Sequence, residues 1–179
     1  MDLHAHFREP GNEDAETVST GLAAAAHGGF TTVCLMPNTT PAADDPSVVA
    51  RVRASVAASG SPVRVLLHGA VTAGRRGETL AAMGELADLG VVGFSDDGSP
   101  VRGAAILRNA LVYAGALGLP IVEHSEDPSL TEGAVGCLLS AGEVVVAVGA
   151  QLAGECSPSF GGEVDLDEAA LLPLADAES

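Results

Sequence analysis

The sequence contains no lysine and no tryptophan, and only 3% of its 179 residues are aromatic. All eight basic residues are therefore arginine, and the core must be built from alanine, valine and leucine. The formal net charge is −16. This charge argues against binding to nucleic acid or to an anionic membrane surface, because both need a basic face. A small anionic substrate is not excluded, since it responds to the charges of one site.

Cysteine is also scarce. Cys34, Cys137 and Cys156 are odd in number and widely spaced, which predicts buried thiols in a reducing compartment and not a disulfide framework. No apolar run reaches the ~18 residues of a membrane span, and no signal peptide precedes the first motif. We therefore expect a cytoplasmic protein. Hydrophobic residues make up 47% of the chain, enough for one domain with a real core.

Short apolar segments alternate with helical patterns over about the first 125 residues. The expected strands cover 2–7, 31–38, 63–72, 91–98 and 119–126, and the expected helices cover 13–29, 45–60, 78–90 and 103–118. Such alternation predicts parallel strands joined by right-handed crossovers, and hence an α/β sheet. The short strands and the lack of a glycine-rich phosphate loop favour a (β/α) barrel over a nucleotide-binding sheet.

The last part of the chain lacks this alternation. A strand is expected within 142–149 and a short helix within 165–179. We therefore predict two segments, a barrel portion of about five βα units over 1–133 and a divergent, irregular segment over 134–179.

Polar side chains stand where the expected strands end. His4 and His6 lie one residue apart at the first strand end, so their side chains share one face. The ends of the other strands carry Asn38, Asp96, Asp97 and His124. In a parallel barrel these ends converge on one rim. Neutral imidazoles and a carboxylate are a suitable ligand set for Zn²⁺, which lowers the pKa of a bound water to near neutrality.

Each of these features also has an ordinary explanation. A pair of histidines on a strand can be surface decoration, a DDG sequence suits a turn, and PNTTP can be a plain loop. His27 is interpreted as a helix-end residue that complements the helix dipole, and His68 as a packing or hydrogen-bonding residue. The joint placement at strand ends is what favours the metal site.

Four motifs carry a family resemblance. DLHAHFREPG, GGFTTVCLMPNTTP, GFSDDGSPV and PIVEHSEDPSL occur in this order within residues 1–133. Together they resemble the dihydroorotases of the amidohydrolase superfamily, in the bacterial class that shares its fold with allantoinases and hydantoinases. The resemblance implies a partial TIM-like (β/α)₈ barrel, one or two zinc ions, and reversible interconversion of N-carbamoyl-L-aspartate and dihydroorotate in pyrimidine biosynthesis.

The resemblance also implies roles for particular residues. His4 and His6 would bind one metal ion and His124 a second. Many relatives bridge the ions with a carbamylated lysine, which a chain without lysine cannot supply. The class resembled uses an aspartate, and spacing to His124 favours Asp97, with Asp96 as the alternative.

Arg8 and Asn38 match the family residues that hold the substrate carboxylate. A guanidinium group offers a planar fork of donors to a carboxylate, and it explains how an acidic chain could hold a dianion.

The chain departs from the family pattern in its second half. The family has a further histidine ligand and a catalytic aspartate on later strands, but no histidine follows His124. Asp165, Asp167 and Asp176 match no motif, so the catalytic residue is unassigned. We therefore expect a truncated dihydroorotase with little or no activity by itself. An incomplete barrel has unpaired strand edges, which also predicts association into a homo-oligomer or with a partner.

Two other functions stay open. One is a non-catalytic relative that binds aspartate transcarbamoylase, although such relatives typically lose the metal-binding histidines that are retained here. The other is a hydrolase of the same kind acting on allantoin or a hydantoin. The pair Arg8 and Asn38 favours a substrate that bears a carboxylate.

Overall fold

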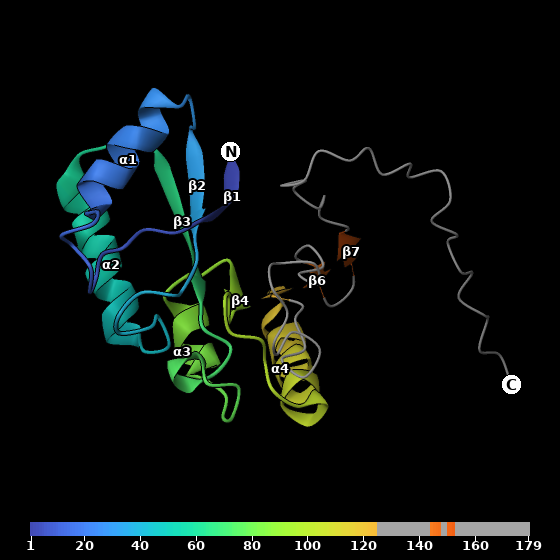
Figure 1. Ribbon diagram of the computed structural model, residues 1–179. Coiled ribbons are helices and arrows are strands. Elements are labelled where there is room, and N and C mark those ends of the chain that lie inside the picture. The colour runs from blue at the N-terminus through green and yellow to red at the C-terminus, as the bar shows by residue number, and fades with distance from the viewer. Residues whose placement is uncertain (125–143, 148–149, 153–179) are drawn as a thin grey trace, which may run out of the picture.

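The computed structural model describes residues 1–124, 144–147 and 150–152 (Figure 1). The parallel strands are β1 (Asp2–Ala5), β2 (Thr32–Leu35), β3 (Arg64–Gly69), β4 (Gly93–Ser95) and β5 (Ile121–Glu123). The helices between them are α1 (Val18–His27), α2 (Pro46–Ser59), α3 (Met83–Asp88) and α4 (Ala104–Leu117). A 3₁₀ turn, η1 (Ala73–Arg75), follows β3.

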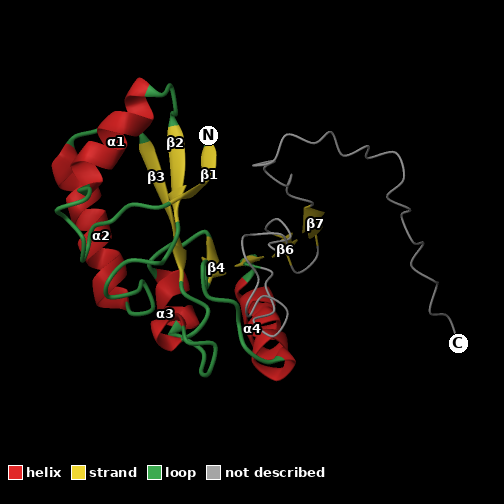
Figure 2. Cartoon of the chain, viewed as in Figure 1, coloured by secondary structure: helices red, strands yellow, loops and turns green. Residues whose placement is uncertain are grey.

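The strands pair in chain order, each parallel to the next from β1 to β5. The helices lie along one side of this sheet, so the strands form the inner wall of a half-barrel (Figure 2). The predicted α/β fold of partial TIM-barrel type is confirmed. Two further strands, β6 (Val144–Ala147) and β7 (Ala150–Leu152), continue the sheet in antiparallel pairing.

The strand expected within 142–149 is thus present as β6, while β7 was not predicted. The helix expected within 165–179 lies outside the described residues. Among the described helices, none is long and apolar enough to cross a lipid bilayer.

Helices α2 and α4 begin and end as the sequence predicts. The side chain of Asp45 accepts a hydrogen bond from the Ser47 N–H group at 2.8 Å, and Pro46 occupies the first turn of α2. Gly60 and Gly118 end the two helices in the left-handed conformation, which glycine adopts without strain.

The predictions for the other two helices were too long. Helix α1 begins at Val18 and not at residue 13, because Thr17 caps it by accepting a hydrogen bond from the Thr20 N–H group. Helix α3 begins at Met83 and not at residue 78. The preceding residues pair with the segment after β3, where the Ala81 N–H group donates to the Val71 carbonyl at 2.9 Å.

The core lies between the sheet and the helices. Small and branched aliphatic side chains dominate it, as the scarcity of aromatics predicts. Its fully buried members include Val18, Leu22, Val33, Val49, Val71, Leu86 and Ile121. Each such side chain contributes about 1.5–3 kcal/mol relative to exposure.

Candidate metal centre

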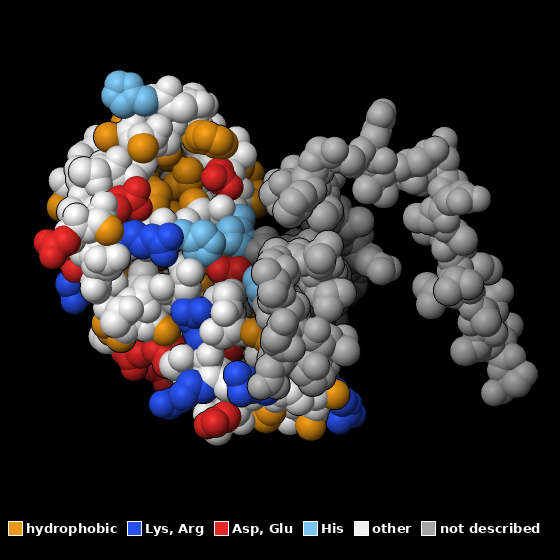
Figure 3. All heavy atoms as spheres, in the orientation of Figure 1, with side chains coloured by type: hydrophobic (Ala, Val, Ile, Leu, Met, Phe, Trp, Pro, Cys, Tyr) orange, Lys and Arg blue, Asp and Glu red, His pale blue; other side chains and the backbone are white. Residues whose placement is uncertain are grey.

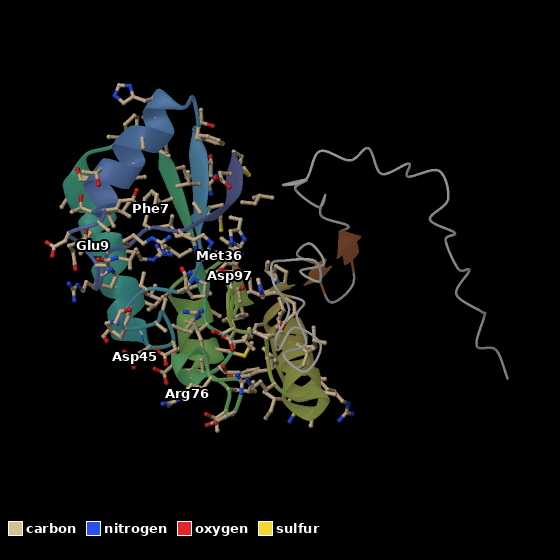
Figure 4. All side chains as sticks on the ribbon, viewed as in Figure 1. Phe7, Glu9, Met36, Asp45, Arg76 and Asp97 are labelled. Carbon is tan, nitrogen blue, oxygen red and sulfur yellow. The ribbon has the colours of Figure 1, made fainter. Side chains whose placement is uncertain are left out.

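Three strands bring polar side chains to one edge of the sheet. His4 lies near the end of β1 and His6 follows it, Asp97 follows β4, and His124 directly follows β5. Because these strands run parallel, their carboxyl ends face the same side of the half-barrel. Figure 4 shows Asp97 at this end of the strands.

The carboxylate of Asp97 lies among three imidazoles. Its Oδ1 atom is 3.6 Å from His4 Nε2 and 3.6 Å from His124 Nδ1. Its Oδ2 atom is 3.4 Å from His6 Nε2. The Nε2 atoms of His4 and His6 are 2.8 Å apart. Figure 3 shows adjacent histidine side chains next to an acidic side chain on one face of the molecule.

This donor set fits a metal ion. Ligand atoms of His4, His6 and Asp97 all lie within 4.8 Å of one another. Nitrogen and oxygen ligands bound tetrahedrally to zinc at about 2.0–2.2 Å are separated from each other by about 3.3 Å. The separations of 2.8–3.6 Å in the cluster bracket this value. Burial also lowers the pKa of His4, which favours the neutral imidazole that a metal requires.

Asn38 supports one of these histidines. Its Oδ1 atom lies 3.0 Å from His6 Nδ1, so the Nδ1–H group of His6 donates to the amide oxygen. That tautomer leaves His6 Nε2, the atom facing Asp97, free of a proton and able to bind a metal ion.

Arg8 lies beyond His6 and is exposed. Its guanidinium group makes no hydrogen bond or ion pair with any residue that the structure describes. The structure therefore joins Asn38 to His6 by a hydrogen bond but shows no such contact for Arg8 within the part of the chain it describes.

The neighbouring aspartate, Asp96, has a different environment. Its carboxylate accepts hydrogen bonds from the N–H groups of Val71 at 2.8 Å and Thr72 at 3.0 Å, and from the Thr72 hydroxyl group. Burial raises its pKa, while these hydrogen bonds act in the opposite direction. The structure thus places Asp97, and not Asp96, among the histidines.

Two groups near the cluster were not found from the sequence. Thr72 is fully buried and anchors Asp96, and Arg75 donates a hydrogen bond to the backbone carbonyl of Asp97. The signal for Thr72 was a hydroxyl residue at the end of an apolar strand. No local pattern marked Arg75, because its partner is 22 residues away in the chain.

His68 stands apart from the cluster, on β3. Its Nδ1 atom is 3.3 Å from Cys34 Sγ, and both side chains are buried. Burial lowers the pKa of His68 to about 4 and raises the pKa of the Cys34 thiol to about 12. The prediction of a packing and hydrogen-bonding residue agrees with this contact. His27 is the last residue of α1, as predicted.

Together, the half-barrel and the cluster at its strand ends define a partial α/β barrel of the TIM type with a candidate metal centre. The family model described as dihydro-orotase-like matches residues 1–172, and the chain belongs to this family.

Curated relatives agree with the family match. The chain is 52% identical over 130 residues to the dihydroorotase of Desulforapulum autotrophicum, which covers 73% of the chain and 30% of that relative. It is 48% identical over 135 residues to the dihydroorotase of Pelotomaculum thermopropionicum, covering 75% of the chain and 31% of the relative. It is 53% identical over 127 residues to that of Anaeromyxobacter sp. (strain K), covering 71% and 29%. The chain thus spans about 30% of the length of the curated relatives it matches.

Proposed function

We propose that the chain carries the metal-binding half of a zinc-dependent dihydroorotase, which interconverts N-carbamoyl-L-aspartate and dihydroorotate in pyrimidine biosynthesis. The observation that carries this proposal is the position of Asp97, 3.4–3.6 Å from the imidazoles of His4, His6 and His124. The reaction is taken from the names of the relatives. The cluster of histidines and an aspartate supports it, because such a cluster can bind the metal ion that this hydrolysis needs.

His4, His6, Asp97 and His124 are the proposed ligands of one or two zinc ions. Zinc held there would polarise the cyclic amide carbonyl and lower the pKa of a water ligand. Asp97 faces histidines on both sides, so it is the residue able to bridge two ions. Asn38 holds His6 in the tautomer that binds metal.

Arg8 is the proposed anchor for the substrate carboxylate. Its exposed guanidinium group has no competing ion pair among the described residues, and its planar fork matches a carboxylate. Asn38 uses its amide oxygen on His6, so its amide N–H group can donate to the same substrate.

The general acid or base is unassigned. Asp165, Asp167 and Asp176 lie outside the described residues, and Asp97 is already proposed as a metal ligand. We therefore expect the isolated 179-residue chain to bind zinc and the substrate but to turn dihydroorotate over slowly or not at all.

Ligand binding distinguishes the proposed dihydroorotase from a hydrolase of allantoin or hydantoins and from a non-catalytic protein. The zinc-loaded chain is titrated calorimetrically with dihydroorotate, allantoin and hydantoin at equal ionic strength. Dihydroorotate should bind and the two rings without a carboxylate should bind much more weakly, with Arg8→Gln removing the difference. Equal binding of all three would favour a hydrolase of allantoin or hydantoins. A chain purified without zinc, and unable to take it up, would favour a non-catalytic role.

We also propose a cytoplasmic location and association with aspartate transcarbamoylase or a second copy of the chain. The buried, unpaired thiol of Cys34 is consistent with a reducing compartment. Val112 and Tyr113 on α4 are 66% and 41% exposed, which supports a partner at that helix. Size-exclusion chromatography with light scattering, with and without aspartate transcarbamoylase, tests both partners.

A further inference from the structure

A polar cleft lies at the same edge of the half-barrel, outside the histidine cluster. It is an open cleft of about 510 Å³ between the segment after β3 and the segment after β4, a size within the range of small-molecule sites. The residues that line it are Arg75, Arg76, Glu78, Gly98, Ser99, Pro100 and Arg102. Figure 3 shows basic side chains gathered on this part of the surface.

The charge of the cleft is opposite to that of the protein. Its lining carries three of the eight arginines and only one carboxylate, Glu78, in a chain with a formal charge of −16. Positive side chains that line one cleft repel one another, and an anion bound there would relieve this repulsion. Arg76 and Arg102 are exposed, and neither side chain forms a hydrogen bond or ion pair with the described part of the chain.

Arg75 is the partly buried arginine of the cleft, and its side chain is hydrogen-bonded to the segment after β4. It has a left-handed backbone conformation, with φ of 55°, which is unusual for a residue with a side chain. Its guanidinium group donates to the Asp97 carbonyl and, at 3.3 Å, to the Ser99 hydroxyl. Its buried Nε–H group has no acceptor within the described residues. A buried donor of this kind is costly unless a further acceptor reaches it.

Glycine is required at two positions in the loops that line the cleft. A Cβ atom at Gly77 would lie 2.6 Å from the backbone nitrogen of Arg102, so only glycine lets the two segments approach this closely. Gly98 has φ of 73°, a left-handed conformation that favours glycine, and lies beside the Arg75 guanidinium group. The Gly77 N–H group also donates to the buried Thr72 hydroxyl at 2.8 Å, which anchors the loop.

We propose that this cleft is a second, metal-independent binding site for a compact small-molecule anion with at least two negative charges, a phosphate compound or a polycarboxylate. Arginine pairs with both groups through two parallel hydrogen bonds, and three guanidinium groups exceed what a single carboxylate can use. Arg76 and Arg102 provide the outer contacts and Arg75 the inner one. The proposal goes beyond the dihydroorotase function, because neither zinc nor the histidines take part.

Equilibrium binding to the full, zinc-free 179-residue chain tests this site. Inorganic pyrophosphate and citrate are titrated separately at constant ionic strength, which separates specific binding from screening. One saturable site is expected. Tighter binding of pyrophosphate assigns the phosphate class, and tighter binding of citrate assigns the polycarboxylate class.

Exposed positions provide the variants, because they preserve the fold. Arg76→Gln and Arg102→Gln should each weaken binding about tenfold, and Glu78→Gln should strengthen it by removing the opposing charge. Arg64→Gln is the matched control, since Arg64 is exposed at the opposite end of β3 and should change binding less than about twofold. Thermal unfolding of each variant checks that the fold is intact.

The variant His6→Ala tests whether anion binding is independent of the proposed metal centre. It removes a metal ligand, so it should weaken zinc binding by more than about 100-fold and leave anion binding unchanged. Loss of anion binding in His6→Ala would place the ion at the histidine cluster and overturn the second site. Absence of saturable binding by both probes, or equal weakening by Arg64→Gln and Arg76→Gln, would overturn it as well.

Discussion

Asp96 accepts hydrogen bonds from both the backbone N–H group and the hydroxyl group of Thr72. Asp96 is 1% exposed and Thr72 is fully buried. Because Thr72 follows β3 and Asp96 follows β4, the pair ties the ends of two adjacent strands together. Asp97 is the next residue, so this buried contact sets the position of the carboxylate that faces the histidines.

Replacing Asp96 should therefore destabilise the fold. Asp96→Asn keeps the volume but turns one acceptor into a donor that faces Thr72, so the free energy of unfolding should fall by about 1–3 kcal/mol. Urea denaturation of the zinc-free chain measures the change. Asp97→Asn is the matched control one residue away and should leave this stability nearly unchanged. Equal losses in the two variants would mean that the buried contact has no special role.

Zinc affinity should depend on the four proposed ligands. Ala substitution of His4, His6 or His124, or Asp97→Asn, should weaken zinc binding by more than about 100-fold, since each removes a donor atom. Competition with a chromophoric chelator gives the affinity. His27→Ala removes an exposed histidine at the end of α1 and should have no effect. The metal assignment fails if the cluster variants bind zinc as well as His27→Ala does.

Asn38 should act on zinc through His6. Asn38→Ala removes the acceptor for His6 Nδ1–H, so zinc affinity should fall by about 10–100-fold, less than for loss of a ligand. Asn38→Asp retains an acceptor and should recover most of the affinity. If Asn38→Ala matches the wild type in the chelator assay, the hydrogen bond does not hold the tautomer.

The buried His68 should make stability depend on pH. Burial lowers its pKa to about 4, below the ordinary value of 6.5, so the unfolded state binds more protons between these values. Its contribution to stability is complete above pH 6.5 and is lost as the pH falls towards 4, by roughly 3 kcal/mol in total.

Denaturation of the wild type and of His68→Gln across this pH range isolates the effect. The loss of stability between pH 6.5 and 4 should be smaller in His68→Gln, and His27→Gln should follow the wild type. Parallel curves for all three proteins would contradict a titrating role for His68.

A side chain at Gly21 of helix α1 should destabilise the fold. A Cβ atom there would lie 2.8 Å from the ring of Phe7, which packs against this face of the helix. Gly21→Ala should lower the free energy of unfolding by about 1–3 kcal/mol despite the higher helix propensity of alanine. The double variant Gly21→Ala, Phe7→Leu makes room and should lose less than the sum of the two single changes. Strict additivity would show that the contact is not the cause.

The fold could be predicted where local and tertiary preferences agree. Helix α2 begins with Asp45 and Pro46 and ends at Gly60, and each of these residues acts within its own turn. Helix α3 shows the opposite case. Residues 78–82 have a helical composition, but their backbone groups pair with the segment after β3, a competition that no local pattern reveals.

Part of the candidate metal centre could likewise be predicted from the sequence, and part of it could not. The spacing of His4 and His6 places both rings on one face, and the strand-end positions of Asp97 and His124 predict convergence with them. Spacing to His124 favoured Asp97, but two adjacent, identical residues left Asp96 open as the alternative. The choice depends on Thr72, whose hydrogen bonds direct Asp96 into the fold.

The sequence by itself determined that the strands are parallel and which histidines and carboxylates stand at their ends. It also excluded a lysine that bridges metal ions. These properties follow from residue types and periodicity along the chain. Only the tertiary structure decided which aspartate faces the histidines and that Arg75, Arg76 and Arg102 share a cleft. Hydrogen bonds and charges act through space, and the loops that bring these residues together are shaped by contacts distant in the chain.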